Sequence, residues 1–173
     1  MDRQKARFTR RTAIGGIAAT AALAAAGCGR SATQGSRQPE AKTSAIAVQA
    51  AAMTVYRDPG CGCCEAWTGL ARNAGYQVSL IDSADMPAIK RKYGVPEGLL
   101  SCHTAVVGDY VVEGHVPLEH VKRLLAQRPT GVKGIAVPGM PAGSPGMEVP
   151  DGTKQPFEVM AFDTAGKVSA FTA

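Results

Sequence analysis

Three cysteines stand within four residues, between a strand pattern and a helix pattern. Cys61-Gly62-Cys63-Cys64 follows the strand-like run Met53–Arg57 and the turn signal Asp58-Pro59-Gly60. The residues after it, Glu65–Asn73, place apolar side chains on one helical stripe, and Gly75 follows as a typical helix-ending residue. A cysteine just before a helix lies near the positive end of the helix dipole, which favours thiolate over thiol. The junction therefore predicts reactive or metal-binding sulfur.

Short strand and helix patterns continue after this junction. The first is a strand at Gln77–Ile81, followed by a helix through Met86, Ile89 and Tyr93, which Asp82 or Ser83 can cap and Gly94 ends. Two strands come next, Thr104–Val107 and Tyr110–Glu113, joined by the turn Gly108-Asp109. A helix then starts at Pro117, and its buried stripe consists of Leu118, Val121, Leu124 and Leu125. The order β-α-β-α-β-β-α, with cysteines at the first strand-to-helix junction, is similar to the thioredoxin fold. The sequence thus predicts an α/β, thioredoxin-like domain.

The last part of the chain has a different composition. Gly and Pro dominate from Arg128 to Gly152, and Met140 and Met147 lie in this stretch. Phe157–Phe162 and Lys167–Phe171 then alternate as two strands. We expect a Gly/Pro/Met-rich loop followed by a C-terminal β-hairpin, and a long loop of this kind is often functional.

The first 28 residues read as an export signal. They carry five basic side chains against Asp2 alone, followed by the apolar run Ala13–Ala26. That run is too short and too rich in Ala and Gly to predict a permanent membrane span. Thr9-Arg10-Arg11 resembles the twin-arginine motif of the route that exports folded proteins. We therefore predict export to the periplasm, with the folded domain at 53–173.

Cys28 closes this leader after Ala25-Ala26-Gly27, an arrangement that resembles a lipoprotein signal. A lipid anchor on Cys28 is favoured over ordinary cleavage after Ala24-Ala25-Ala26, since the fifth cysteine would otherwise be a free thiol in an oxidising compartment. Residues 29–52, rich in Ser, Ala, Gln and Thr, are typical of a flexible tether.

The formal net charge of +5 does not indicate a nucleic-acid partner. Most of the excess lies in the leader, and the remaining residues carry 14 basic and 13 acidic side chains. Without a basic patch there is no electrostatic footprint for phosphate.

Cys102 adds a fourth sulfur. It lies immediately before the predicted strand Thr104–Val107, at the place where thioredoxin-like proteins carry a cis-proline loop beside the C-x-x-C pair. No proline occurs between Pro96 and Pro117, and Ser101-Cys102 takes that place. The predicted fold therefore brings Cys102 onto Cys61, Cys63 and Cys64. Four soft donors select Cu(I) or Zn(II) over hard cations.

Copper is favoured over zinc by the crowding of the cysteines. Adjacent Cys63 and Cys64 point in different directions and fit a single tetrahedral ion poorly. Thiolates that bridge several Cu(I) ions relax this requirement. Zinc stays the alternative metal.

Histidines and methionines are secondary candidates for ligation. His103 begins a strand, so its ring is expected to point away from Cys102, and His115 ends the hairpin near Pro117. For both, a surface or hydrogen-bonded imidazole is the alternative, and His120 is expected to be solvated. Met140 and Met147 offer thioethers on a lid over the thiolates, or alternatively fill space beneath the loop.

Four motifs follow one another along the folded part: Tyr56–Cys64 (YRDPGCGCC), Ser101–Ala105 (SCHTA), Val112–Pro117 (VEGHVP) and Gly134–Met147 (GIAVPGMPAGSPGM). In this combination the chain resembles the exported copper-resistance family CopG, which is not the DNA-binding repressor of that name. The resemblance covers about residues 53–173. It implies a thioredoxin-like fold and a cysteine-bridged cluster of several copper ions, with Cys61, Cys63, Cys64 and Cys102 at the ligand positions.

Two functions from different classes follow. The first is a periplasmic copper-binding protein that holds Cu(I) for copper resistance or handling, with copper ions and other periplasmic copper-handling proteins as partners and no catalytic residue. The second is a thioredoxin-like oxidoreductase that uses Cys61 and Cys64 on disulfides or on copper. The cysteine in place of the cis-proline disfavours disulfide reduction.

Overall fold

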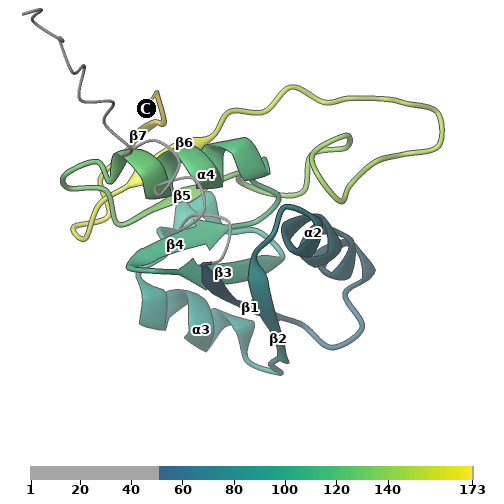
Figure 1. The fold of residues 1–173 in the computed structure, drawn as a ribbon, viewed down its shortest axis with the longest axis horizontal. Helices are drawn as coiled ribbons and strands as arrows, with labels where there is room; N and C mark the ends of the chain where they lie inside the picture. Colours follow the sequence, from purple (N-terminus) through teal and green to yellow (C-terminus); the bar gives the residue numbers. More distant parts are fainter. Residues whose placement is uncertain (1–50, 173) are drawn as a thin grey trace, which may run out of the picture. The chain divides into compact units, whose positions relative to one another are not determined.

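The computed structural model describes residues 51–172, and in that part the strands form one mixed sheet in the order β2-β1-β3-β4-β5-β6-β7 (Figure 1). The elements are β1 (Ala52–Arg57), α2 (Gly62–Asn73), β2 (Gln77–Asp82), α3 (Met86–Tyr93), the 3-10 turn η1 (Glu97–Leu99), β3 (His103–Val107), β4 (Tyr110–Glu113), α4 (Leu118–Gln127), β5 (Gly134–Ala136), β6 (Met160–Phe162) and β7 (Val168–Ala170).

The central strands set the frame for the cysteines. β1 pairs in parallel with β2 and antiparallel with β3, and β3 pairs antiparallel with β4. β5 adds in parallel to β4, and β6 and β7 follow as an antiparallel pair. The end of β1 therefore lies beside the start of β3, with Arg57 opposite His103. This pairing brings the segment before α2 next to the segment before β3.

Apolar side chains pack on both faces of the sheet. One cluster joins Trp67 of α2 and Leu124 of α4 to alternate strand residues such as Val112. The other joins Val111, the next residue of β4, to Leu99 and Phe162. Neighbouring strand residues point to opposite faces, so β4 serves both clusters. In Figure 1, α3 accordingly lies across the sheet from α4.

The mixed α/β class predicted from the sequence is confirmed, whereas the thioredoxin-like detail stays a prediction. The predicted strands up to Glu113 and the helix after Pro117 occur at the expected places. The C-terminal hairpin is present but shorter than predicted, with β6 and β7 of three residues each.

Three local predictions were wrong. α2 begins at Gly62 rather than Glu65, so Cys63 and Cys64 belong to its first turn and not to a preceding loop. Asp85, not Asp82 or Ser83, caps α3, because its carboxylate accepts the backbone N–H of Ala88 at 2.9 Å. β5 forms within the stretch that was expected to be loop, because it can pair with both β4 and β6.

The predicted export signal at 1–28, the lipid anchor at Cys28 and nearly all of the tether at 29–52 lie outside the described residues. Between residues 51 and 172, each helix is too short or too polar to cross a bilayer.

Candidate metal centre

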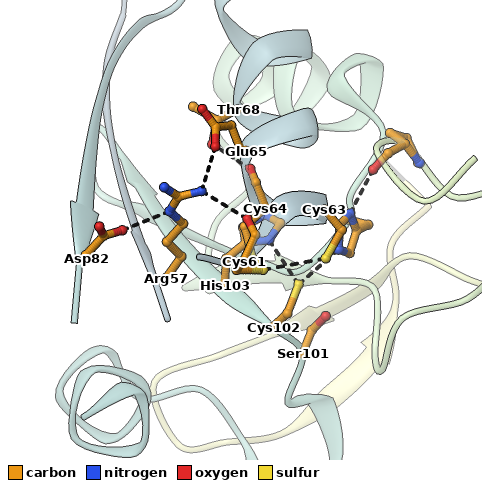
Figure 2. Close-up of a disulfide and its surroundings, with 12 residues drawn as sticks. Arg57, Cys61, Cys63, Cys64, Glu65, Thr68, Asp82, Ser101, Cys102 and His103 are labelled. Carbon is orange, nitrogen blue, oxygen red and sulfur yellow. Dashed lines mark hydrogen bonds and ion pairs between the residues drawn. A yellow bond between two sulfur atoms is a disulfide. The ribbon is translucent and has the colours of Figure 1, made fainter. Parts of the chain in front are cut away.

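Four cysteine sulfurs gather where α2 begins. Cys61 is the N-cap of α2, Cys63 and Cys64 lie in its first turn, and Cys102 comes from the segment just before β3. Their sulfur atoms all lie within 4.8 Å of one another, and those of Cys61 and Cys63 are 3.5 Å apart (Figure 2). The structure thus brings together the four residues that the sequence selected as ligands.

A disulfide joins Cys61 to Cys64, with an S–S distance of 2.02 Å. Among the cysteines in the described part of the chain, Cys63 and Cys102 are free, and both are half-buried. A disulfide sulfur carries no thiolate charge, so this form offers two thiols to a metal. Reduction of the Cys61–Cys64 bond makes four cysteine sulfurs available to a metal.

Arg57 ties the end of β1 to the first turn of α2. Its guanidinium donates to the backbone oxygen of Cys61 at 3.0 Å and pairs with Asp82 at 2.9 Å and Glu65 at 3.3 Å (Figure 2). The hydrogen bond with Asp82, followed by that with Glu65, raises the pKa of Arg57 above its usual value against the opposing effect of burial. No motif in the sequence singles out Arg57 as a site residue. Its place at the end of an otherwise apolar strand, four residues before Cys61, was the available signal.

The Cys102 thiol is hard to ionise in this form. Burial raises its pKa to about 12, and the nearby Cys63 sulfur adds to the effect. A metal ion that binds to this sulfur must displace a proton, so binding there is coupled to proton release.

Both histidines of the predicted set are buried against Cys102. The sulfur of Cys102 lies 2.9 Å from Nε2 of His115 and 3.3 Å from Nδ1 of His103. The expectation that His103 points away from Cys102 was wrong. Cys102 precedes β3, so the alternation of side chains along a strand does not apply to it. Neither imidazole lies at the surface.

The Pro145 carbonyl fixes the orientation of the His115 ring. Nδ1 of His115 lies 2.8 Å from the oxygen of Pro145. A carbonyl oxygen only accepts, so Nδ1 carries the proton and Nε2 presents its lone pair to Cys102. A carbonyl on the outer nitrogen is the usual arrangement around a metal-binding histidine.

His103 packs between two rings. Its centroid is 4.7 Å from that of Trp67 and 5.0 Å from that of His115. Within residues 51–172, its Nε2 atom has no hydrogen-bond partner. Burial lowers the pKa of His103 well below its usual value, and it also lowers that of His115. Both rings are therefore neutral at neutral pH, the form that binds metals. Cys102, His103 and His115 form a second group of possible metal ligands.

The loop after β5 covers the site with its backbone. A Cβ atom on Gly146 would lie 2.7 Å from the backbone nitrogen of Trp67 and 3.1 Å from the oxygen of Cys63, so this glycine rests on α2. Figure 1 shows the segment between β5 and β6 running out toward α2 and back. Met140 is 54% exposed and Met147 is half-buried. Ligation by these methionines stays a prediction.

His120 lies apart from the site, on α4. It is half-buried, with its ring 6.1 Å from that of Phe171, so the expectation of a solvated side chain was wrong. The pattern of the helix alone does not indicate that the C-terminal segment around Phe171 packs against this side chain.

The chain is similar to one described family and to two solved structures. Residues 99–147, which include Cys102 and both buried histidines, match the family model described as "Protein of unknown function, DUF411". Two solved structures of the copper resistance protein copG, form 2 and form 1, are each 40% identical to this chain. They match with TM-scores of 0.66 and 0.64, over 70% and 69% of this chain and 95% and 93% of theirs. No curated protein matches at a significant level. On this identity and coverage, the chain belongs to the CopG family of copper resistance proteins.

Proposed function

We propose that the protein holds copper as a cluster of several Cu(I) ions bridged by the thiolates of Cys61, Cys63, Cys64 and Cys102. The observation that carries this proposal is the gathering of four sulfur atoms within 4.8 Å, in a chain of a copper resistance family. Thiolates are soft donors that favour Cu(I). Cys63 and Cys64 are neighbours in one helical turn, so bridging between ions suits them better than closing a single tetrahedral zinc site.

The neutral histidines support a role beside the sulfurs. Nε2 of His115 faces Cys102 with its lone pair, and Nδ1 of His103 lies on the same sulfur. We propose His115 as the first additional ligand because the Pro145 carbonyl already holds its ring in the ligating tautomer.

A second function, reduction of Cu(II), is favoured by the Cys61–Cys64 disulfide beside two free thiols. The Cys61 and Cys64 thiolates would each give one electron to one Cu(II) ion. The products are two Cu(I) ions and the Cys61–Cys64 disulfide, and any thiol protons go to solvent. Cys63 and Cys102 remain to hold Cu(I) as it forms.

The leader supports a place of action in the periplasm. The predicted signal at 1–28 is the basis for that proposal, as Cys28 is for a lipid anchor, and other periplasmic copper-handling proteins are the proposed partners.

The test is the metal content of the full chain, purified without oxygen from copper-supplemented cells. We expect more than one copper per chain, and about one zinc per chain with little copper would contradict the cluster. For the redox function, reduced copper-free protein is mixed anaerobically with Cu(II). Two Cu(I) ions, detected with a Cu(I)-specific chelator, should form per disulfide. A Cys64→Ser variant, which cannot form that disulfide, should lose this stoichiometry.

A further inference from the structure

A buried ion pair lies behind the Cys102 segment. Lys90 of α3 and Glu113 of β4 place Nζ and Oε1 2.5 Å apart, and the Lys90 side chain is 9% exposed and that of Glu113 is fully buried. The Thr104 hydroxyl donates to Oε2 of Glu113 at 2.6 Å and accepts from Lys90 at 3.2 Å. Thr104 and Glu113 are cross-strand partners, so the sheet itself brings this ring of contacts together.

Stability does not explain this ion pair. Moving two charges out of water costs several kcal/mol per ion, and replacing such a pair with apolar residues of similar volume is often neutral or stabilising. On the same face of β4, Val111 is already buried in an apolar cluster. A polar acceptor at this buried place, neutralised by Lys90, therefore calls for another role.

Beyond Lys90 and Thr104, the Glu113 carboxylate contacts the segment that carries Cys102. Its Oε1 atom accepts the backbone N–H of Ser101 at 2.7 Å. Ser101 precedes Cys102, and β3 begins only at His103, so the sheet ladder does not hold this segment. Lys90 and Thr104 hold the carboxylate in place, and the carboxylate in turn holds the backbone N–H of Ser101.

The opposite side of the segment is also held. The backbone N–H of Gly139 donates to the oxygen of Leu100 at 3.0 Å, and the Ser101 hydroxyl donates to the oxygen of Gly139. Gly114 packs directly against Ser101. A Cβ atom on Gly114 would lie 2.5 Å from the Cβ atom of Ser101 and 2.7 Å from the backbone oxygen of Val137. Ser101 is thus held by Glu113 on one side and by Gly139 of the loop on the other, and Cys102 is the next residue.

We propose that Glu113 is a positioning residue for Cys102. Its carboxylate, anchored by Lys90 and Thr104, holds the Ser101 N–H so that the Cys102 sulfur faces the sulfurs of α2. The expected consequence, tight Cu(I) binding, rests on the proposed copper function. The contacts of Glu113 with Lys90, Thr104 and Ser101 exist without copper.

Two charge-free variants isolate the contact with Ser101. Glu113→Gln with Lys90→Met keeps an oxygen acceptor for the Ser101 N–H and leaves no buried charge unpaired. Glu113→Leu with Lys90→Met and Thr104→Val fills the same space without any acceptor. Thermal unfolding of the copper-free proteins checks that both fold.

The first measurement needs no copper. In the full chain carrying Cys28→Ser and the Cys61–Cys64 disulfide, the alkylation rates of Cys102 and Cys63 by iodoacetamide are compared by peptide mass spectrometry. Cys63 is the internal reference. We expect the Cys102-to-Cys63 ratio to rise severalfold in the leucine variant and to stay at the wild-type value in the glutamine variant.

The second measurement is competition for Cu(I) against a chromogenic chelator. In the leucine variant, Cu(I) binding must order the Ser101–Cys102 segment that a hydrogen bond of about 1–1.5 kcal/mol otherwise holds, so we expect a loss of affinity of up to about tenfold. The glutamine variant should bind as the wild type does. If the leucine variant fails to fold, Glu113→Asp, which draws the carboxylate back by one methylene, should show the same direction of change.

Equal alkylation ratios in both variants and the wild type would overturn the positioning role. A glutamine variant that behaves like the leucine variant would overturn it too, because charge rather than the Ser101 contact would then matter. Failure of the wild type to bind copper would instead refute the proposed function, and the alkylation ratios would still decide the role of Glu113.

Discussion

Cys102 has two kinds of neighbour. The sulfurs of Cys61, Cys63 and Cys64 lie within 4.8 Å of its own sulfur, and ring nitrogens of His103 and His115 lie at 3.3 and 2.9 Å. Sulfur favours Cu(I), whereas imidazole also suits Cu(II). In the proposed function, Cys102 would therefore be the residue at which copper could exchange sulfur for imidazole ligands as its oxidation state changes.

Cys102→Ser should lower the number of copper ions bound per chain, because a neutral hydroxyl is a hard, weak donor. It should also lower the melting temperature of the copper-loaded protein more than that of the copper-free protein, since a bound ion stabilises only the folded state. Metal analysis and thermal unfolding of both forms check this, with Cys28→Ser as the control. Full copper content in Cys102→Ser would refute the four-sulfur site.

At the scale of elements, α2 shows where sequence patterns fall short. Its N-cap, Cys61, makes no side-chain capping hydrogen bond, so the usual Ser, Thr or Asp signal for a helix start is missing. Gly62 also suggests a turn rather than a first helical residue. β5 carries too few residues for a periodic signal, and it exists because β4 and β6 flank it.

The cysteines of the site could be predicted because motif and element order alone place them. Their surroundings could not, because they depend on contacts between distant segments. The Pro145 carbonyl on His115 and the Glu113 carboxylate on Ser101 join residues 30 and 12 positions apart. For the contact between Glu113 and Ser101, the one signal in the sequence was that the apolar strand Tyr110–Glu113 ends in a charged residue, Glu113.

Gly146→Ala should loosen the loop over α2. A methyl group there would meet the backbone of Trp67 at 2.7 Å, and its displacement would draw the Pro145 oxygen away from His115. Gly152→Ala is the matched control, because Gly146 and Gly152 have φ angles of 81° and 73° and a Cβ on Gly152 would meet nothing within 4 Å. Both variants pay the left-handed backbone cost of roughly 1–2 kcal/mol.

Only Gly146→Ala should increase the amount of Cu(I) that a competing chelator removes from the protein. In the copper-free protein, only this variant should increase the alkylation rate of Cys63. Identical behaviour of the two alanine variants would mean that the loop does not cover the site.

At the scale of the whole molecule, the buried histidines link stability to pH. Burial keeps the pKa of His103 well below 6.5 in the folded state, so below about pH 6.5 the unfolded chain binds a proton that the folded chain does not. The free energy of unfolding of the copper-free protein should therefore decrease as pH falls from 6.5 toward the folded-state pKa. Melting temperatures measured between pH 8 and pH 5 should show this decrease, and it should be smaller in His103→Gln. Parallel profiles for the two proteins would exclude His103 as its source.

The order of the chain has a consequence for synthesis. All four cysteines of the site lie before residue 103, whereas the loop residues Pro145 and Gly146 and the strands that carry the loop follow β4. A ribosome thus completes the sulfur ligands well before the segment that covers them. During that interval the nascent chain exposes thiols that oxidants and stray metal ions can reach. Synthesis in a reducing compartment, with copper met only after the last strand has joined the sheet, would protect them.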